Sequence, residues 1–120
     1  MATILVVDDE YLIADILSFA LEDEGFMVVT ASNGQKGLEI LDRERPDLII
    51  TDFMMPVMDG QEFATAVRAL PSCKHLPIIL MSGAQAHIGM QRSDLFNAVL
   101  PKPFSMDAIL AEVRKLLSLE

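Results

Sequence analysis

The chain has 120 residues, a hydrophobic content of 52% and a formal net charge of −9. That length suits one compact domain, and that much apolar surface excludes disorder as the dominant state. The acidic balance argues against binding to nucleic acid or to an anionic membrane, and no apolar run reaches the ~20 residues of a membrane span. With no basic N-terminal stretch, we expect a cytoplasmic protein whose residues 1–120 form one domain without an output domain.

Short apolar runs and segments of helical spacing alternate along the chain. In chain order they predict a strand over 4–7, a helix containing 13–21 that stops near Gly25, a strand over 26–29, a helix over 31–44 capped by Ser32 or Asn33, a strand over 48–50, a helix containing 63–70 that ends at Pro71, a strand over 78–81, a short helix between 83 and 94, a strand over 98–100 and a helix containing 109–117 capped by Ser105. The nearly continuous apolar runs are typical of parallel strands that helices cover on both faces. The pattern therefore predicts a doubly wound α/β fold with a five-stranded parallel sheet.

Polar residues follow four of these strands, at the edge where ligands bind in doubly wound sheets. They are Asp8, Asp9 and Glu10 after the first strand, Asp52 after the third, Ser82 after the fourth and Lys102 after the fifth. Clustered carboxylates repel one another unless a cation offsets their charge, and Mg²⁺ suits carboxylate and phosphate oxygens. A carboxylate can also attack phosphorus, while a lysine neutralises the phosphoryl oxygens. The set predicts magnesium-dependent phosphoryl chemistry.

At these residues the chain resembles the receiver domain of response regulators. The matching motifs, which together span nearly the whole chain, are Asp8-Asp9, Asp52-Phe53-Met54-Met55-Pro56-Val57-Met58-Asp59-Gly60, Ser82 and Pro101-Lys102-Pro103-Phe104. The resemblance implies a flavodoxin-like fold with strand order 2-1-3-4-5. It also implies a signalling switch in a two-component phosphorelay, phosphorylated by a sensor histidine kinase or a histidine phosphotransfer protein and acting on a downstream protein. A homodimer through the last strand and its two flanking helices is compatible with this family.

The resemblance also implies a role for each site residue. Asp52 would be the phosphoacceptor, Asp9 a direct Mg²⁺ ligand, Asp8 a ligand mostly through water, the backbone carbonyl of Met54 a further ligand, Lys102 the partner of the acceptor and then of the phosphoryl group, and Ser82 the hydroxyl that moves to bond the phosphoryl oxygen. The Lys102–Pro103 peptide would be cis. Such a domain is not a metabolic enzyme, because it catalyses only its own phosphoryl transfer and a slow hydrolysis of the aspartyl phosphate.

Two features depart from the family pattern. Many receivers have a Tyr or Phe three residues before the lysine, where this chain has Val99. A β-branched aliphatic side chain cannot make the rotamer exchange of an aromatic ring. The segment 84–90 also lacks the usual acidic helix, so we expect a short, displaced or partly disordered helix there. We therefore predict intact chemistry with an altered output switch.

Other interpretations of these residues stay open. Asp8 and Asp9 are also suited to cap the first helix, and Ser82 is compatible with an ordinary turn. As a whole, the domain is also compatible with a phosphorylation-independent interaction or dimerisation module that keeps a vestigial acidic pocket. A haloacid-dehalogenase-type phosphohydrolase would need an acid at the position of Met54, and a flavodoxin-like redox carrier would need a phosphate-binding first loop in place of the acids.

Overall fold

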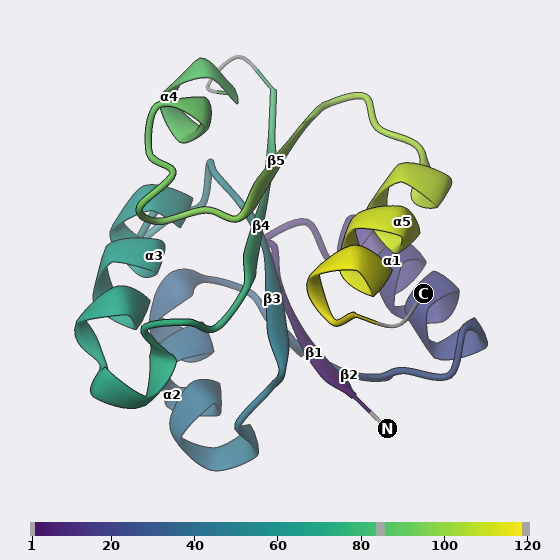
Figure 1. Cartoon of the computed structure of the whole chain (residues 1–120), viewed down its shortest axis with the longest axis horizontal. Coiled ribbons are helices and arrows are strands. Elements are labelled where there is room, and N and C mark those ends of the chain that lie inside the picture. The colour runs from purple at the N-terminus through teal and green to yellow at the C-terminus, as the bar shows by residue number, and fades with distance from the viewer. Residues whose placement is uncertain (1, 84–85, 119–120) are drawn as a thin grey trace.

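The computed structural model describes residues 2–83 and 86–118. Strands and helices alternate along them, with one short 3₁₀ turn, and Figure 1 shows their arrangement. The elements are β1 (Thr3–Val7), α1 (Tyr11–Asp23), β2 (Met27–Ala31), α2 (Gly34–Glu44), β3 (Leu48–Asp52), α3 (Gly60–Ala69), η1 (Pro71–Cys73), β4 (Ile78–Ser82), α4 (Ala86–Met90), β5 (Ala98–Pro101) and α5 (Met106–Leu116). The five strands pair in parallel in the order β2-β1-β3-β4-β5, which confirms the predicted fold class and strand order.

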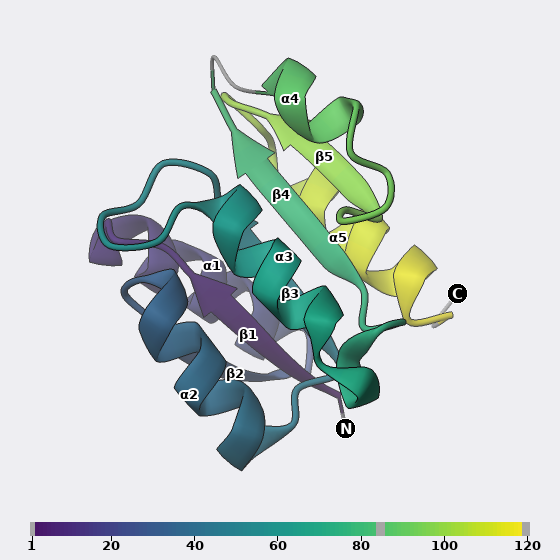
Figure 2. The ribbon, with the colours of Figure 1, turned by 90° about the vertical axis from the view of Figure 1, so that its left-hand side faces the viewer.

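The sheet is covered on both faces, as the continuous apolar runs predict. Neighbouring residues of β1 enter opposite cores: Leu5 and Val7 pack on the side of α2 and α3, while Ile4 and Val6 pack on the side of α1 and α5. Figures 1 and 2 show α2, α3 and α4 on one face of the sheet and α1 and α5 on the other. All four of these strand residues are fully buried, so β1 is packed from both sides.

The second helix begins later than the sequence predicts. Ala31 continues β2 and pairs with Val7 of β1, so the predicted start of the helix at residue 31 is wrong. The helix begins at Gly34, and the side chain of Asn33 caps it by accepting a hydrogen bond from the backbone N–H of Lys36. Pairing with the neighbouring strand thus extends β2 beyond its apolar run.

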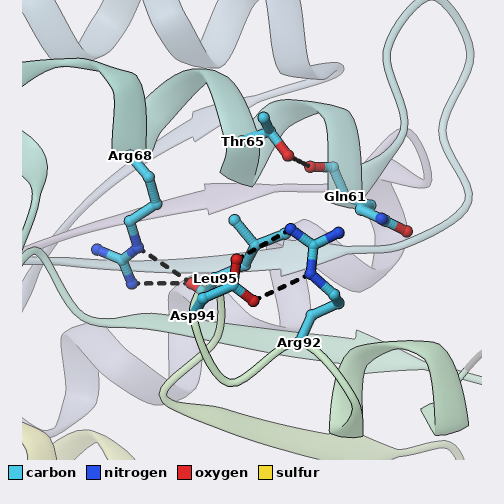
Figure 3. Close-up of polar contacts among 6 residues, drawn as sticks. All are labelled: Gln61, Thr65, Arg68, Arg92, Asp94 and Leu95. Carbon is cyan, nitrogen blue, oxygen red and sulfur yellow. Dashed lines mark hydrogen bonds and ion pairs between the residues drawn. The ribbon is translucent and has the colours of Figure 1, made fainter.

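The segment before β5 is held against α3 by one arginine. The guanidinium of Arg68 donates hydrogen bonds from Nε (3.2 Å) and Nη2 (2.8 Å) to the backbone oxygen of Leu95, as Figure 3 shows. Its Nη1 donates to the backbone oxygen of Leu76 at 2.6 Å, and Nη2 also reaches Oδ1 of Asn97 at 3.0 Å. Leu95 and the following Phe96 are buried, so this segment is firmly anchored.

Two further expectations concern the fourth helix and the peptide bond after Lys102. The predicted short fourth helix is found as the five-residue α4, although residues 84 and 85 of that segment lie outside the described residues. The Lys102–Pro103 peptide is cis, as the resemblance implies. Within the described residues, no helix has both the length and the apolar character needed to cross a membrane.

Candidate functional site

Two buried carboxylates meet at the carboxyl edge of the sheet. Asp8 follows β1 directly and Asp52 is the last residue of β3, and these two strands lie side by side in the sheet. Only 2% of Asp8 and 5% of Asp52 are exposed. Asp8, Asp52 and the exposed Glu10 each offer one carboxylate oxygen, and these three oxygens lie within 4.8 Å of one another. Because carboxylates this close repel one another, the arrangement favours a bound cation.

A lysine that follows β5 contacts this cluster of carboxylates. Lys102 lies just after β5, and its Nζ donates a hydrogen bond to Oδ1 of Asp52 over 3.1 Å. Lys102 and Asp52 are 50 residues apart in sequence. They meet because β3, β4 and β5 are consecutive strands of a parallel sheet, with their carboxyl ends at the same edge. The ammonium leaves the second oxygen of Asp52 available for another partner.

Burial raises the pKa of both aspartates. Loss of solvent raises the pKa of Asp8 to about 6, opposed by the hydrogen bond that its carboxylate accepts from the backbone N–H of Glu10. Burial also raises the pKa of Asp52, and the hydrogen bond from Lys102 opposes that shift. The single ammonium therefore does not fully offset the cost of ionising two buried acids. An additional cation would favour the ionised form of both.

Two buried oxygens at the site have no partner among the described residues. They are Oδ2 of Asp8 and Oγ of Ser82, the last residue of β4. A buried polar atom without a hydrogen bond is costly, and such atoms in native proteins commonly serve a ligand or an ion. Together with the three clustered carboxylates, the free oxygen of Asp8 fits a hard divalent cation such as Mg²⁺.

The structure brings most of the predicted site residues together. Asp8, Asp52, Ser82 and Lys102 all stand at the same edge of the sheet, at or just after the ends of β1, β3, β4 and β5. Asp59 and Gly60, which end the motif after β3, lie at the start of α3, where Asp59 and Glu62 form a reciprocal capping box.

Two acidic neighbours differ from expectation in their placement. Asp9 is exposed and is not one of the three acids whose oxygens cluster, whereas Glu10 is. The family resemblance assigns no metal role to Glu10, yet the carboxylate of Glu10 lies in the cluster. The N-cap of α1 is Glu10 without a side-chain cap bond, so neither Asp8 nor Asp9 caps that helix. Met54 has an exposed side chain, and the metal role proposed for its backbone carbonyl stays a prediction.

The raised pKa of Asp8 predicts how stability depends on pH without metal. Between about pH 4 and pH 6 the folded chain keeps a proton on Asp8 that the unfolded chain has released, so stability falls as the pH rises through this window. A shift from 3.8 to about 6 corresponds to roughly 3 kcal/mol. Urea unfolding in chelator at pH 4 and pH 7 should show this loss, and Mg²⁺ at pH 7 should reverse it. Asp8→Asn should remove the Asp8 contribution, and an identical pH profile in that variant would contradict the assignment.

The fold and this acidic pocket together define a phosphoacceptor signalling module rather than a conventional enzyme. The chain belongs to the response regulator receiver domain family, whose model matches residues 4–114. It is 34% identical over 119 residues to the sporulation initiation phosphotransferase F of Bacillus subtilis, covering 98% of this chain and 94% of that protein.

Solved structures agree in fold. The chemotaxis protein CheY4 of Vibrio cholerae superposes with a TM-score of 0.90 at 34% identity, covering 97% of this chain and 98% of the other. The response regulator TrrA of Thermotoga maritima, solved in complex with Mg²⁺ and beryllofluoride, superposes with a TM-score of 0.86 at 35% identity, covering 97% and 99%. Relatives of this fold therefore bind magnesium, and the acidic cluster of this chain resembles such a site.

Proposed function

We propose that the chain is a phosphorylation-dependent switch of a two-component phosphorelay, in which Asp52 accepts the phosphoryl group. The observation that carries this proposal is the hydrogen bond between Nζ of Lys102 and Oδ1 of Asp52 beside the buried Asp8. An acid and an amine from distant parts of the chain meet there with an excess of negative charge. That combination suits a metal and a phosphoryl group better than it suits a structural ion pair.

The phosphoryl transfer itself requires few groups. A carboxylate oxygen of Asp52 attacks the phosphorus of a phosphohistidine, and an O–P bond forms as the P–N bond breaks. The electron pair of that bond remains on the imidazole nitrogen, which takes up a proton from solvent. Lys102 favours the ionised form of Asp52 before the attack and then donates to the phosphoryl oxygens, while the hydroxyl of Ser82 donates to another of them.

The metal ligands belong to the same proposal. Asp8, Asp9, Asp52 and the backbone carbonyl of Met54 are the ligands that the family resemblance assigns, and Glu10 joins them because its carboxylate lies in the cluster. When bound, Mg²⁺ supplies positive charge that neutralises the phosphoryl oxygens. Without it, Asp8 and Asp52 face each other with only the ammonium of Lys102 to offset them.

The donor would be a sensor histidine kinase or a histidine phosphotransfer protein, and it needs a contact surface next to Asp52. Helix α1 starts three residues after Asp8 and exposes a row of apolar side chains, with Leu12, Ile16 and Phe19 exposed by 70%, 58% and 70%. An apolar hollow lies beside this row and includes Ile16, Lys102 and Phe104 in its lining. Because Lys102 belongs to both, the hollow is continuous with the acceptor site.

A charge on this row should slow transfer from a protein donor and leave small donors unaffected. Ile16→Glu places a carboxylate in the apolar contact, and we expect transfer from a phosphorylated histidine protein to slow about tenfold or more. Phosphorylation by acetyl phosphate should stay unchanged. The matched control is Met27→Glu, since Met27 is similarly exposed (56%) but begins β2 at the opposite edge of the sheet. Equal slowing in both variants, or none in Ile16→Glu, would reject α1 as the docking face.

A second function is favoured by Val99 and the short α4: a phosphorylation-independent interaction module with a vestigial pocket. The two functions separate in a titration with Mg²⁺ and then with beryllofluoride, a mimic of the phosphoryl group, followed by NMR. The proposed switch predicts that both bind and that resonances around Asp52 and Ser82 shift. Absence of binding and of spectral change would favour the second function.

A further inference from the structure

Helices α2 and α3 lie side by side on one face of the sheet (Figure 2) and touch near their first turns. A Cβ atom at Gly37 of α2 would lie 2.9 Å from Cε1 of Phe63 in α3, so the backbone of α2 packs directly against that ring. The last turns of the two helices, together with η1, instead border a cavity of about 450 Å³. Cavities of this size are typical of sites for small molecules.

The lining of this cavity is largely apolar. Leu38 and Leu41 of α2 and Ala66 of α3 line it, with Leu70 just after α3. Leu41 is buried, whereas Leu70 is 39% exposed, so the apolar lining runs from the core to the surface. Such a lining favours a ligand that removes a hydrocarbon group from water. The cavity therefore suits a small molecule with an apolar side chain.

Two opposite charges stand at the same cavity. Asp42, in the last turn of α2, and Arg45, the residue that ends this helix, both line it. In the described part of the chain, neither side chain forms an ion pair. A purely anionic ligand would face Asp42, and a purely cationic ligand would face Arg45. A ligand that carries both charges satisfies both residues, because a carboxylate pairs with a guanidinium and an ammonium group pairs with a carboxylate.

We propose that this cavity binds a small zwitterion with an apolar side chain, of the chemical class of leucine. The carboxylate of the ligand pairs with Arg45, its ammonium group pairs with Asp42, and its hydrocarbon group packs on Leu38 and Leu41. The last turn of α2 leads to the start of β3, whereas Asp52 ends that strand, so the cavity lies near the opposite edge of the sheet from the acidic cluster. Binding there does not require phosphorylation of Asp52, so either proposal can fail without the other.

The first test is a titration of the whole chain with L-leucine, followed by NMR. Both charged residues are exposed, so we expect a dissociation constant on the order of 1 mM, with resonance shifts at Leu38, Leu41 and Leu70. Three analogues each lack one feature of leucine: isocaproate has no ammonium group, isoamylamine has no carboxylate and glycine has no hydrocarbon side chain. Each should bind at least about threefold more weakly. Absence of shifts with leucine, or equal binding of any analogue, would overturn the inference.

The thiol of Cys73 gives an independent measure of binding in the same cavity. Cys73 is the only cysteine of the chain, it is half-buried, and it lines the cavity. Bound leucine should shield this thiol, so its alkylation by iodoacetamide should slow about twofold at half-saturating leucine. The same concentration of glycine should have no effect. A rate that saturating leucine leaves unchanged would place the ligand outside this cavity and would contradict the proposal.

A larger side chain in the cavity should weaken binding. Ala66→Leu fills part of the space between the helices, and we expect the affinity for leucine to fall about tenfold or more. Ala69→Leu is the matched control, because it makes the same change at an exposed position of α3 that does not line the cavity. Urea unfolding checks that both variants are folded. Equal affinities of the two variants for leucine would overturn the inference.

Arg45→Gln tests the charge without filling the cavity. The affinity for leucine should fall about threefold, while the affinity for isoamylamine, which has no carboxylate to pair, should stay the same. Arg43→Gln is the control, since Arg43 is in the last turn of the same helix, lies 3.7 Å from a carboxylate oxygen of Glu44 and does not line the cavity. Equal weakening of leucine and isoamylamine would assign Arg45 a merely structural role. That result, or equal weakening of leucine binding in Arg43→Gln, would reject the proposed contact.

Discussion

Asp52→Asn should abolish magnesium-dependent phosphorylation by acetyl phosphate. The amide keeps the shape of the side chain but has no anionic oxygen to attack phosphorus, and it offers the cation a weaker ligand. The loss should be complete within detection, because Asp52 is the carboxylate of the cluster that Lys102 contacts, and Asp8 and Glu10 are assigned to the metal instead. The measurement is incorporation of labelled phosphate into the folded variant, with and without Mg²⁺.

The fold of this variant should survive the change. Burial raises the pKa of Asp52, which means that the ionised carboxylate is costly to bury and a neutral side chain avoids that cost. Asp42→Asn is the matched control, since it makes the same chemical change on the exposed surface of α2, away from the acidic cluster. Persistent labelling of Asp52→Asn would reject Asp52 as the acceptor. Loss of labelling in Asp42→Asn would show that net charge, not the acceptor, controls the reaction.

Gly60→Ala should destabilise the protein and disturb the acceptor at the same time. A Cβ at Gly60 would lie 2.4 Å from the backbone oxygen of Asp52 and 2.9 Å from Cα of Phe53. Both contacts are backbone, so the loop after β3 must shift, and the hydrogen bond from the Gly60 N–H to the oxygen of Phe53 (2.7 Å) must lengthen. We expect the free energy of unfolding to fall by about 3 kcal/mol. The better helix propensity of alanine offsets at most about 1 kcal/mol of the strain.

The chain offers a close control for this substitution. Gly83→Ala also follows a strand at the carboxyl edge, but a Cβ there meets nothing within 4 Å. Urea unfolding should show a large decrease in the free energy of unfolding for Gly60→Ala and little change for Gly83→Ala. Phosphorylation by acetyl phosphate should also be slower in the folded Gly60→Ala variant. Equal stability of the two variants would contradict the claim that the α3 start is pressed against the acceptor strand.

The sequence predicts most of the site because the chemistry sits at strand ends. A run of buried strand residues fixes where each strand stops, and parallel pairing then brings those ends to one edge. Asp8, Asp52, Ser82 and Lys102 follow from that logic alone. The start of α2 does not follow from it. Ala31 belongs to β2 because it pairs with Val7 of β1, and local propensity does not encode such a long-range contact.

Two other features depend on detail that spacing cannot supply. Asp9 and Glu10 are adjacent, and which of them turns toward Asp52 depends on backbone angles at the entry to α1 rather than on residue type. Val99 of β5 and Gly89 of α4 are in contact, since a Cβ atom at Gly89 would lie 3.2 Å from Cγ2 of Val99. Each residue alone looks like a departure or a helix breaker, and the pair makes sense only once α4 is seen against β5.

The role of Asp52 as phosphoacceptor is best examined by locating the phosphoryl group on the wild-type chain. After incubation with Mg²⁺ and acetyl phosphate, borohydride reduces an acyl phosphate at an aspartate to homoserine, and peptide mass spectrometry then reads its position. We expect modification at Asp52 alone, dependent on Mg²⁺. Modification at another acid of the cluster, or an equal yield at Asp52 in the presence of a chelator, would contradict it.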